Sequence, residues 1–282
     1  MSNYFVIGNP ISHSLSPLIH NYWFKKYKIQ SIYKKKKLEE NDLKAFTDEM
    51  RNNKNINGAN VTVPFKKKII PFLDELTSIS ENTQSVNTII KKNGKLTGHN
   101  TDATAFLETL GEYKRQESNK PLRSLVIGAG GVASSVIFAL EELNNSESTT
   151  YIFNRTKINA EKMLIDIVRN KKGKYSTMIK PTVLEWGDIP KNLEIVVNTT
   201  TVGLKKDENL NLNFSNYKGL EHVLFYDLIY NPKETSFLSD AKKRGNKIMN
   251  GNMMFLLQAK QAFHHWTDVD VEIDDEILKL LD

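Results

Sequence analysis

The chain has 282 residues, enough for one large domain or two ordinary domains with a sizeable core. Hydrophobic residues make up 39% and charged residues 26% of it, as in globular proteins, and no apolar run reaches the roughly 18 residues that a membrane-spanning helix needs. Cysteine is absent, which excludes disulfide frameworks, thiolate metal sites and a cysteine nucleophile. The N-terminal segment lacks the basic and apolar regions of a secretory signal, so we expect a cytoplasmic protein with no membrane partner.

The net charge of +6 comes from lysine rather than arginine. Lysine runs at 34–37 and 66–68 favour nucleic-acid binding as one interpretation. Nucleic-acid sites, however, use arginine heavily, because its planar fork binds bases and phosphates through paired hydrogen bonds. The chain contains only six arginines, so a general bias toward lysine explains the charge more simply. We predict no nucleic-acid partner.

The apolar pattern predicts alternating strands and helices along the whole chain. The predicted strands are residues 4–8, 31–35, 59–63, 86–90, 95–98, 124–127, 150–153, 195–198 and 223–227. The predicted helices are residues 16–27, 39–53, 101–113, 132–143, 159–169, 234–244, 253–266 and 276–281, with a loop at 114–121. Asn93-Gly94 predicts a tight hairpin turn. Strand–helix alternation is typical of α/β proteins with mostly parallel sheets, and a glycine-rich unit near residue 125 indicates a second sheet.

Serines alternate with other residues before the first predicted helix, at Ser12, Ser14 and Ser16. Hydroxyl groups two residues apart can bind one oxyanion, whose charge the N-terminus of the following helix stabilises. The pair Ser16-Pro17 is equally typical of simple capping, with serine as the N-cap and proline at the first helical position. Spacing alone leaves both interpretations open.

Polar residues also follow later strands, at Thr62, Lys66, Asn87 and Asp102. Ligands of an open parallel sheet collect beyond the carboxyl ends of its strands, and we expect all four residues at such ends. A lysine, a carboxylate and amides suit a polyhydroxylated substrate and proton transfer during carbonyl reduction. Alternatively, Lys66 is merely a solvated member of its lysine run.

Metal binding is not expected, because no cluster of His, Asp and Glu has the spacing of metal ligands. His13 and His20 are expected to be structural or exposed.

The segment 125–133 is the strongest local motif. Gly128, Gly130 and Ala133 fit the pattern G-x-G-x-x-(G/A) between a predicted strand and a predicted helix. The first glycine permits a tight turn, the second lets a pyrophosphate approach the backbone, and the small third residue allows close helix–strand packing. Free amide groups at the helix N-terminus would bind the phosphates. We predict a dinucleotide site, and the alternative is a glycine turn without a ligand.

The next predicted strand leads into Asn154, Arg155 and Thr156. An NAD site usually has Asp or Glu here to bind the ribose 2′-hydroxyl, whereas Arg suits a 2′-phosphate. Because Arg155 is one of only six arginines, we predict NADP as the cofactor, with Lys157 adding charge at the same corner. The alternative is an ordinary surface arginine.

Taken together, these features resemble the bacterial shikimate dehydrogenases over essentially the whole chain. The resemblance rests on nine ordered motifs, which read GNPISHSLSP, ANVTVPFK, VNT, GHNTD, IGAGG, FNRT, NTTTVG, YDLIYNP and GNMMFLLQA. It implies NADPH-dependent, reversible reduction of 3-dehydroshikimate to shikimate, in the pathway to chorismate and the aromatic amino acids. It also implies a substrate domain at 1–102 completed by helices at 250–282, a Rossmann-type NADP domain at 103–249, and a monomer or homodimer.

The resemblance also assigns roles to individual residues. Ser14 and Ser16 match the serines that bind the substrate carboxylate, and Thr62, Lys66, Asn87 and Asp102 match residues that hold its hydroxyls, with Lys66 and Asp102 as the acid–base pair. Further substrate-pocket positions match Tyr230 and Gln258. The matched NADP-binding positions are Gly128, Ala129, Gly130, Gly131, Asn154, Arg155 and Thr156, with lesser contacts at Thr200, Thr201, Leu228 and Gly251.

Three positions depart from the family pattern. Asn159 replaces a second arginine of many NADP-specific members, Ala103 replaces a common glycine, and Met253 replaces a glycine near the nicotinamide pocket. One alternative is therefore an enzyme that also acts on quinate, with NAD, although quinate-active members often have threonine where this chain has Ser16. The other is a non-catalytic sensor of NADP and shikimate-like ligands, against which the intact lysine–aspartate pair argues.

Overall fold

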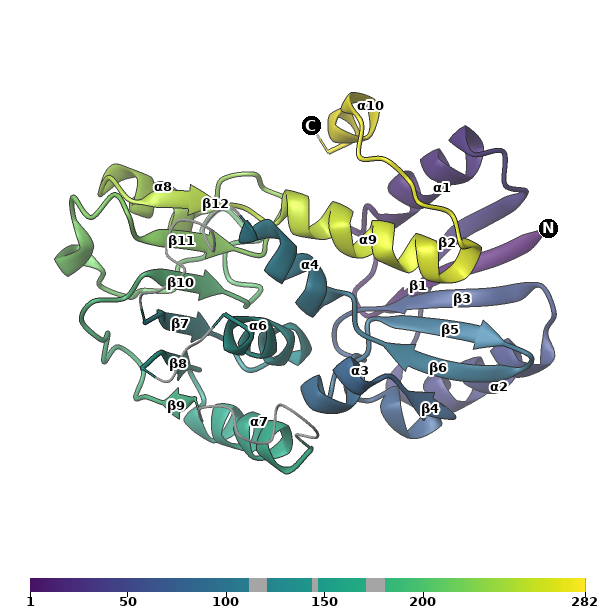
Figure 1. The fold of residues 1–282 in the computed structure, drawn as a ribbon, viewed down its shortest axis with the longest axis horizontal. Coiled ribbons are helices and arrows are strands. Elements are labelled where there is room, and N and C mark those ends of the chain that lie inside the picture. Colours follow the sequence, from purple (N-terminus) through teal and green to yellow (C-terminus); the bar gives the residue numbers. More distant parts are fainter. Residues whose placement is uncertain (112–120, 144–146, 171–180, 282) are drawn as a thin grey trace. The chain divides into compact units, whose positions relative to one another are not determined.

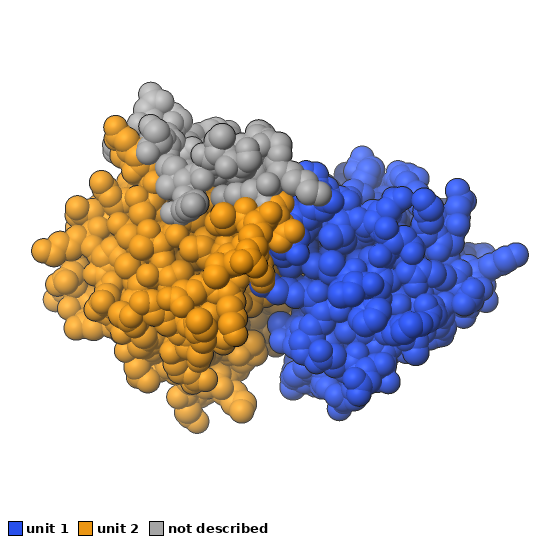
Figure 2. Space-filling model, turned by 90° about the horizontal axis from the view of Figure 1, so that it is seen from below, with its two compact units in different colours: residues 1–105, 256–282 blue, residues 106–255 orange. Residues whose placement is uncertain are grey.

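The computed structural model describes residues 1–111, 121–143, 147–170 and 181–281. The chain forms two compact units, one of residues 1–105 and 256–282 and the other of residues 106–255 (Figure 2). The predicted loop at 114–121, apart from its last residue, and the end of the helix predicted at 101–113 lie outside the described residues. No helix among the described residues is long and apolar enough to cross a membrane.

The first unit is built on a six-stranded mixed sheet (Figure 1). Its strands, in the spatial order β2-β1-β3-β5-β6-β4, are β1 (Ser2–Gly8), β2 (Ser31–Lys37), β3 (Ile56–Val61), β4 (Glu75–Leu76), β5 (Thr88–Lys92) and β6 (Lys95–His99). Its helices are α1 (Ser16–Lys26), α2 (Leu43–Asn52), α3 (Ser78–Thr83), the start of α4 (Asp102–Thr109), most of α9 (Asn252–Thr267) and α10 (Asp275–Lys279). Three of its five strand pairings are parallel, and β5 is antiparallel to both of its neighbours.

The hairpin of β5 and β6 confirms the predicted tight turn. Asn93 and Gly94 both have positive φ, at 51° and 79°, which is the conformation that a two-residue turn with the twist of its strands requires. The turn matters for function because it returns the chain to the edge of the sheet where β5 began.

Alternation along β1 explains why both faces of this sheet are covered. Tyr4 packs against Phe24 of α1 and Trp266 of α9 on one face, with ring centroids 5.2 and 5.0 Å apart. Phe5 points to the other face and meets Phe46 of α2 edge-on. Each face therefore buries an apolar layer.

The second unit contains a six-stranded sheet that is parallel throughout (Figure 1). Its strands, in the order β12-β11-β10-β7-β8-β9, are β7 (Arg123–Ile127), β8 (Thr149–Phe153), β9 (Thr182–Val183), β10 (Ile195–Asn198), β11 (Leu224–Asp227) and β12 (Lys247–Met249). Its complete helices are α6 (Gly131–Glu141), α7 (Lys157–Asn170) and α8 (Ser236–Lys243). The α/β class with two sheets is thus confirmed.

The central strands of this second sheet read as continuous apolar runs because both of their faces are buried. Phe225 of β11 packs with Phe237 of α8 on one face, and Tyr226 stacks on Phe106 of α4 on the other. Since all strands run the same way, the segments after β7, β8, β10 and β11 share one edge.

Candidate functional site

The serine pair lies at the start of α1 in the first unit. Ser16 is the first residue of the helix and Leu15 is its N-cap, so the predicted capping role of Ser16 is wrong. The Ser14 hydroxyl instead donates to the Ser16 hydroxyl over 3.2 Å, and the Ser16 amide donates to Ser14 Oγ over 3.3 Å. Ser12 is exposed and does not join this pair in the described contacts. Two hydroxyls that face each other at a helix N-terminus can bind one oxyanion.

Lys66 and Asp102 form a largely buried ion pair. Lys66 Nζ lies 2.6 Å from Asp102 Oδ2, and the side chains are only 13% and 7% exposed. Asn87 Nδ2 donates to the other carboxylate oxygen over 2.9 Å, which fixes the orientation of Asp102. In contrast, Lys68 pairs with Glu40 at the exposed surface. Lys66 is therefore not a solvated member of its run.

The topology of the first sheet explains this meeting. Lys66 follows the end of β3, and Asp102 follows the end of β6. Asn87 precedes β5, so the expectation that it lies at the carboxyl end of a strand is wrong. Because β5 is antiparallel to β3 and β6, its amino end lies at the edge where those two strands end. The three side chains consequently share one edge.

Buried polar contacts support Asn87, the partner of Asp102, from behind. The Tyr33 hydroxyl donates to Asn60 Oδ1 over 2.6 Å. Asn60 Nδ2 donates to the main-chain oxygen of Asn87 over 3.1 Å. Burial raises the pKa of the Tyr33 phenol well above its ordinary value, so this hydroxyl stays neutral and able to donate. Tyr33 and Asn87 are thus held by one polar network through Asn60.

Tyr33 and Asn60 were not among the predicted site residues. The sequence signal was an amide within an otherwise apolar predicted strand, since a buried amide needs hydrogen-bond partners. The structure shows that Asn60 is only 6% exposed. Identifying the partner needed the pairing of distant strands, which local sequence does not give.

The other predicted substrate residues divide between the units. Thr62 follows β3 and packs on the backbone at Gly8, where a Cβ atom would lie 2.5 Å from Thr62 Cγ2. Gln258 is half-buried on the part of α9 that belongs to the first unit. Tyr230 belongs to the second unit, where it stacks on Phe255 at 4.4 Å.

The glycine motif of the second unit forms an open turn into α6. Gly128 has a φ of +120°, and a Cβ atom there would lie 2.4 Å from Thr199 Oγ1. Gly130 is the N-cap of α6, and no heavy atom lies within 4 Å of the Cβ that a larger residue would have. Gly131 is the first residue of the helix. Ala129, between Gly128 and Gly130, is half-buried. The turn before α6 therefore leaves open space beside Gly130, as the close approach of a pyrophosphate requires.

The corner after β8 carries the predicted 2′-phosphate site. Asn154 Nδ2 donates to the main-chain oxygen of Thr156 over 2.8 Å, which shapes the turn. Arg155 is exposed and free to meet a ligand's charge. Lys157 forms an ion pair with Glu185, so the extra charge expected from Lys157 is largely neutralised. Arg155 is the cation that fits a 2′-phosphate here.

The lesser predicted cofactor contacts lie after β10 and β11. The Thr200 hydroxyl donates to Asn198 Oδ1 over 2.8 Å, and Thr201 next to it is exposed. The amide of Leu228 donates to Asn198 O over 3.0 Å. Gly251 has no room for a side chain, because its Cβ would lie 2.1 Å from the Leu228 carbonyl oxygen. These segments border the same carboxyl edge as the glycine turn.

A metal was not expected. Within the described part of the chain, no group of three or more His, Asp and Glu residues is arranged to hold one. His13 is exposed and His20 is fully buried among aromatic rings. The absence of a metal from the reaction stays a prediction.

Comparison with known proteins confirms the resemblance. Residues 6–89 match the model of the shikimate dehydrogenase substrate binding domain. The shikimate dehydrogenase (NADP(+)) of Pelagibacter ubique (strain HTCC1062) is 42% identical over 279 residues, which cover 99% of this chain and 98% of the relative.

Solved structures agree with this relative. Shikimate 5-dehydrogenase from Listeria monocytogenes, crystallised with shikimate and NAD, is 28% identical with a TM-score of 0.83, covering 100% of this chain and 96% of that chain. The enzyme from Thermus thermophilus, crystallised with NADP(H) and shikimate, is 28% identical with a TM-score of 0.78, covering 96% of this chain and 95% of that chain. This chain therefore belongs to the family of NADP(+)-dependent shikimate dehydrogenases.

Proposed function

We propose that this chain catalyses the reversible, NADPH-dependent reduction of 3-dehydroshikimate to shikimate, within the pathway to chorismate and the aromatic amino acids. The buried pair of Lys66 and Asp102 carries the proposal, because an ammonium held at a fixed position by a carboxylate is suited to proton transfer at a carbonyl. Relatives across nearly the full length of the chain bear the name of this activity.

The polar groups of the first unit fit a substrate with one carboxylate and several hydroxyls. We assign the carboxylate to Ser14 and Ser16, whose hydroxyls face each other. We assign the substrate hydroxyls to Thr62, Asn87 and Asp102. Gln258 and Tyr230 are further proposed pocket residues. The hydrogen bonds from Tyr33 to Asn60 and from Asn60 to Asn87 support the assignment of Asn87, since they fix its position.

Lys66 performs the acid–base step. Its ammonium group donates a hydrogen bond to the carbonyl oxygen, stabilises the negative charge that develops there and supplies the proton that completes the alcohol. Asp102 keeps the ammonium in place and accepts a hydrogen bond from a substrate hydroxyl. When bound, NADPH supplies the hydride for the carbonyl carbon. In the oxidation of shikimate, Lys66 takes the proton back.

The glycine turn and the corner after β8 are the proposed NADP site. Gly128, Ala129, Gly130 and Gly131 receive the pyrophosphate, and Asn154, Arg155 and Thr156 the phosphorylated ribose. Thr200, Thr201, Leu228 and Gly251 border the nicotinamide end. In this proposal residues 103–249 act as the NADP domain, and residues 1–102 with 250–282 act as the substrate domain. A cytoplasmic location and a monomeric or homodimeric state are part of the same proposal.

The test is shikimate oxidation with NADP+, followed at 340 nm. We expect Lys66→Ala to lower kcat at least 100-fold with little change in KM for NADP+, because acid–base catalysis contributes about 10²–10⁴-fold. Lys68→Ala is the matched control, since it removes a neighbouring lysine whose partner, Glu40, lies at the surface. Near-normal kcat in Lys66→Ala would remove the acid–base role.

The same assay separates the alternatives. An enzyme specific for shikimate and NADP oxidises shikimate faster than quinate, and with NADP+ faster than with NAD+. A sensor would bind the ligands without turnover, and faster turnover with quinate and NAD+ would assign the chain to the quinate-active branch.

A further inference from the structure

The second unit contains a buried carboxylate, Asp227, next to the segments with Thr200 and Leu228 that we assign to the nicotinamide end of the cofactor. It ends β11, pairs in register with Asn198 of β10 and is fully buried. Its Oδ1 accepts hydrogen bonds from Asn198 Nδ2 over 3.1 Å and from the Ile229 amide over 3.0 Å. Its Oδ2 accepts from the Thr235 hydroxyl over 2.6 Å. One side chain thus receives three hydrogen bonds from three separate segments.

Each of these partners controls a different part of the predicted cofactor edge. Asn198 Oδ1 accepts from both the amide and the hydroxyl of Thr200, over 3.0 and 2.8 Å, and its Nδ2 also donates to Val202 O over 3.2 Å. The orientation of the Asn198 amide therefore sets the turn that follows β10. Asp227 selects that orientation, because a carboxylate accepts only from the amide NH₂.

The second partner, Ile229, belongs to the loop after β11. Its carbonyl oxygen accepts from the Gly251 amide over 3.1 Å, and Gly251 packs directly on the Leu228 carbonyl. The third partner, Thr235, caps α8 by accepting from the Leu238 amide. Asp227 consequently ties the segment of Leu228 and Gly251 to the segment of Thr200.

The buried carboxylate also carries a cost in folding free energy. Its hydrogen-bond partners are all neutral, and burial raises the pKa of Asp227 to about 6. A buried charge with neutral partners destabilises the folded state, and the hydrogen bonds that it accepts offset this cost only in part. Positions that sacrifice stability in this way are commonly found at functional sites.

We propose that Asp227 is a positioning residue of the cofactor site, which fixes the loops after β10 and β11 in the arrangement that binds the nicotinamide end of NADP(H). This inference rests on the proposed function, because it takes Thr200, Leu228 and Gly251 as cofactor contacts. Asp227 itself is fully buried and acts only through Asn198, Ile229 and Thr235.

The test measures the Kd for NADPH directly, by the fluorescence of the nucleotide, on the full chain. We expect Asp227→Ala to raise this Kd about tenfold, because all three hydrogen bonds are lost. Asp227→Asn should recover most of the affinity, since its carbonyl still accepts from Asn198 and Ile229 and its amide can donate to Thr235 Oγ1. Thr235→Val keeps the shape of the side chain and removes both its hydrogen bond to Asp227 and the cap of α8. This variant should give an intermediate Kd, and it is the second test if Asp227→Ala does not fold.

Ser148→Ala is the matched control. Ser148 is equally buried in the second unit, and its hydroxyl accepts from the Leu122 amide at the amino end of the same sheet. Its loss should lower thermal stability and leave the Kd unchanged. Equal Kd values for Asp227→Ala and Ser148→Ala, or no rescue by asparagine, would overturn the positioning role.

Hydrogen exchange distinguishes this inference from the proposed function. Asp227→Ala should speed amide exchange at residues 199–203 and 228–230 without NADPH, while Ser148→Ala should not. If the wild-type chain binds no NADPH, the cofactor proposal fails, and the exchange pattern still decides whether Asp227 holds these loops.

Discussion

At the scale of single residues, partners rather than composition decide what the lysines do. The lysine run at 34–37 lies on β2, the edge strand of the first sheet, where lysines hinder pairing with another chain. Lys36 pairs with Glu49 and lies 4.9 Å from the centre of the Phe46 ring, and Lys35 donates to the Ser12 carbonyl oxygen. These contacts give two of the four lysines partners within the chain. Lys66 is the exception, because it and its partner Asp102 are both largely buried.

In the second unit, Arg155 is the basic residue whose substitution gives a specific prediction. Because Lys157 is engaged with Glu185, Arg155 is the cation placed to meet a 2′-phosphate. Arg155→Ala should raise KM for NADPH about tenfold or more and leave KM for NADH within about twofold, as expected from loss of one charge-assisted contact. Steady-state kinetics with both nucleotides check this.

Lys157→Ala is the control for Arg155→Ala. It removes a cation from the same corner whose charge Glu185 already balances, so it should change KM for NADPH only slightly. A similar rise in KM for NADPH and NADH in Arg155→Ala would contradict the 2′-phosphate assignment.

At the scale of elements, regular patterns were predictable and short pairings were not. The hairpin at Asn93-Gly94 and the strand–turn–helix at Gly128 follow from local chemistry, and both are present. The two-residue strands β4 and β9, the three-residue β12 and the six-residue α3 were missed, because segments this short carry no periodicity. The three short strands form because they pair with longer strands that lie far away in the sequence.

The candidate site divides in the same way. The sequence motifs single out Lys66 and Asp102 as candidates, and their pairing follows from strands that share an edge. The antiparallel direction of β5, which brings Asn87 to that edge, depends on strand pairing and was not predictable from the motif. Tyr33 and Asn60 lie 27 residues apart and meet only in the folded sheet.

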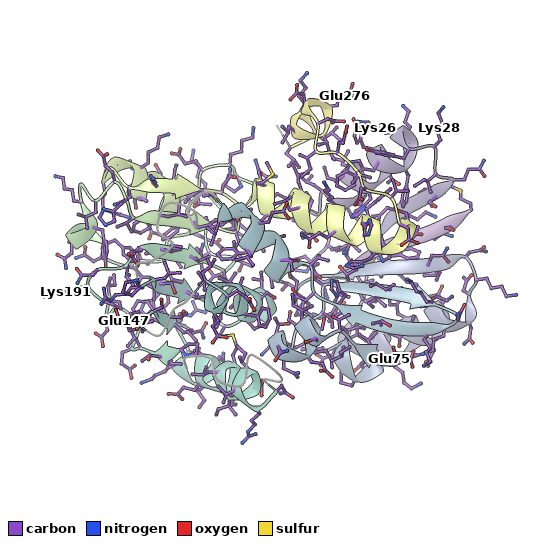
Figure 3. All side chains as sticks on the ribbon, in the orientation of Figure 1. Lys26, Lys28, Glu75, Glu147, Lys191 and Glu276 are labelled. Carbon is purple, nitrogen blue, oxygen red and sulfur yellow. The ribbon has the colours of Figure 1, made fainter. Side chains whose placement is uncertain are left out.

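The C-terminal helix α10 gives an element-scale prediction. Its N-cap Asp274 accepts from the Ile277 amide over 2.8 Å and also binds Tyr22 and Lys26 of α1, at 2.7 and 2.5 Å. Figure 3 labels Lys26 on α1 and Glu276 on α10. Asp274→Ala should lower the free energy of unfolding by about 1–2 kcal/mol, chiefly through loss of the cap. Denaturant titration measures this.

Glu272→Ala is the control for the contribution of charge alone. Its carboxylate lies 3.8 Å from Lys26 but is 79% exposed, so its removal should change stability by less than about 0.5 kcal/mol. If both variants lose the same stability, the cap is not the source.

At the scale of the whole molecule, the two units should respond to acid in opposite directions. Burial lowers the pKa of His20 to about 3, and burial together with His265 lowers that of His99 to about 4; both lie in the first unit. Asp227, in the second unit, has a pKa raised to about 6 by burial. The sign of each effect follows from which state of the protein binds the proton more tightly.

Below pH 6.5 His20 and His99 bind protons in the unfolded state, whereas in the folded state their lowered pKa values keep them neutral. The first unit therefore loses stability as the pH falls. At pH 5 this amounts to about 2 kcal/mol for each histidine. Asp227 does the reverse, because below pH 6 its folded carboxyl takes up a proton while the unfolded one stays ionised down to about pH 4. The second unit should therefore gain about 1 kcal/mol between pH 7.5 and pH 5.

Amide hydrogen exchange between pH 7.5 and pH 5, corrected for intrinsic rates, measures the stability of both units in the same molecule. Protection of β1 and β3 should fall with acid, while protection of β7 and β10 should hold or rise. Asp227→Asn should abolish the gain in the second unit only, and His99→Asn should reduce the loss in the first unit only, with exposed His222→Asn as control. A parallel loss in both units would mean that the buried charge of Asp227 is compensated, and the stability argument for its role would fall with it.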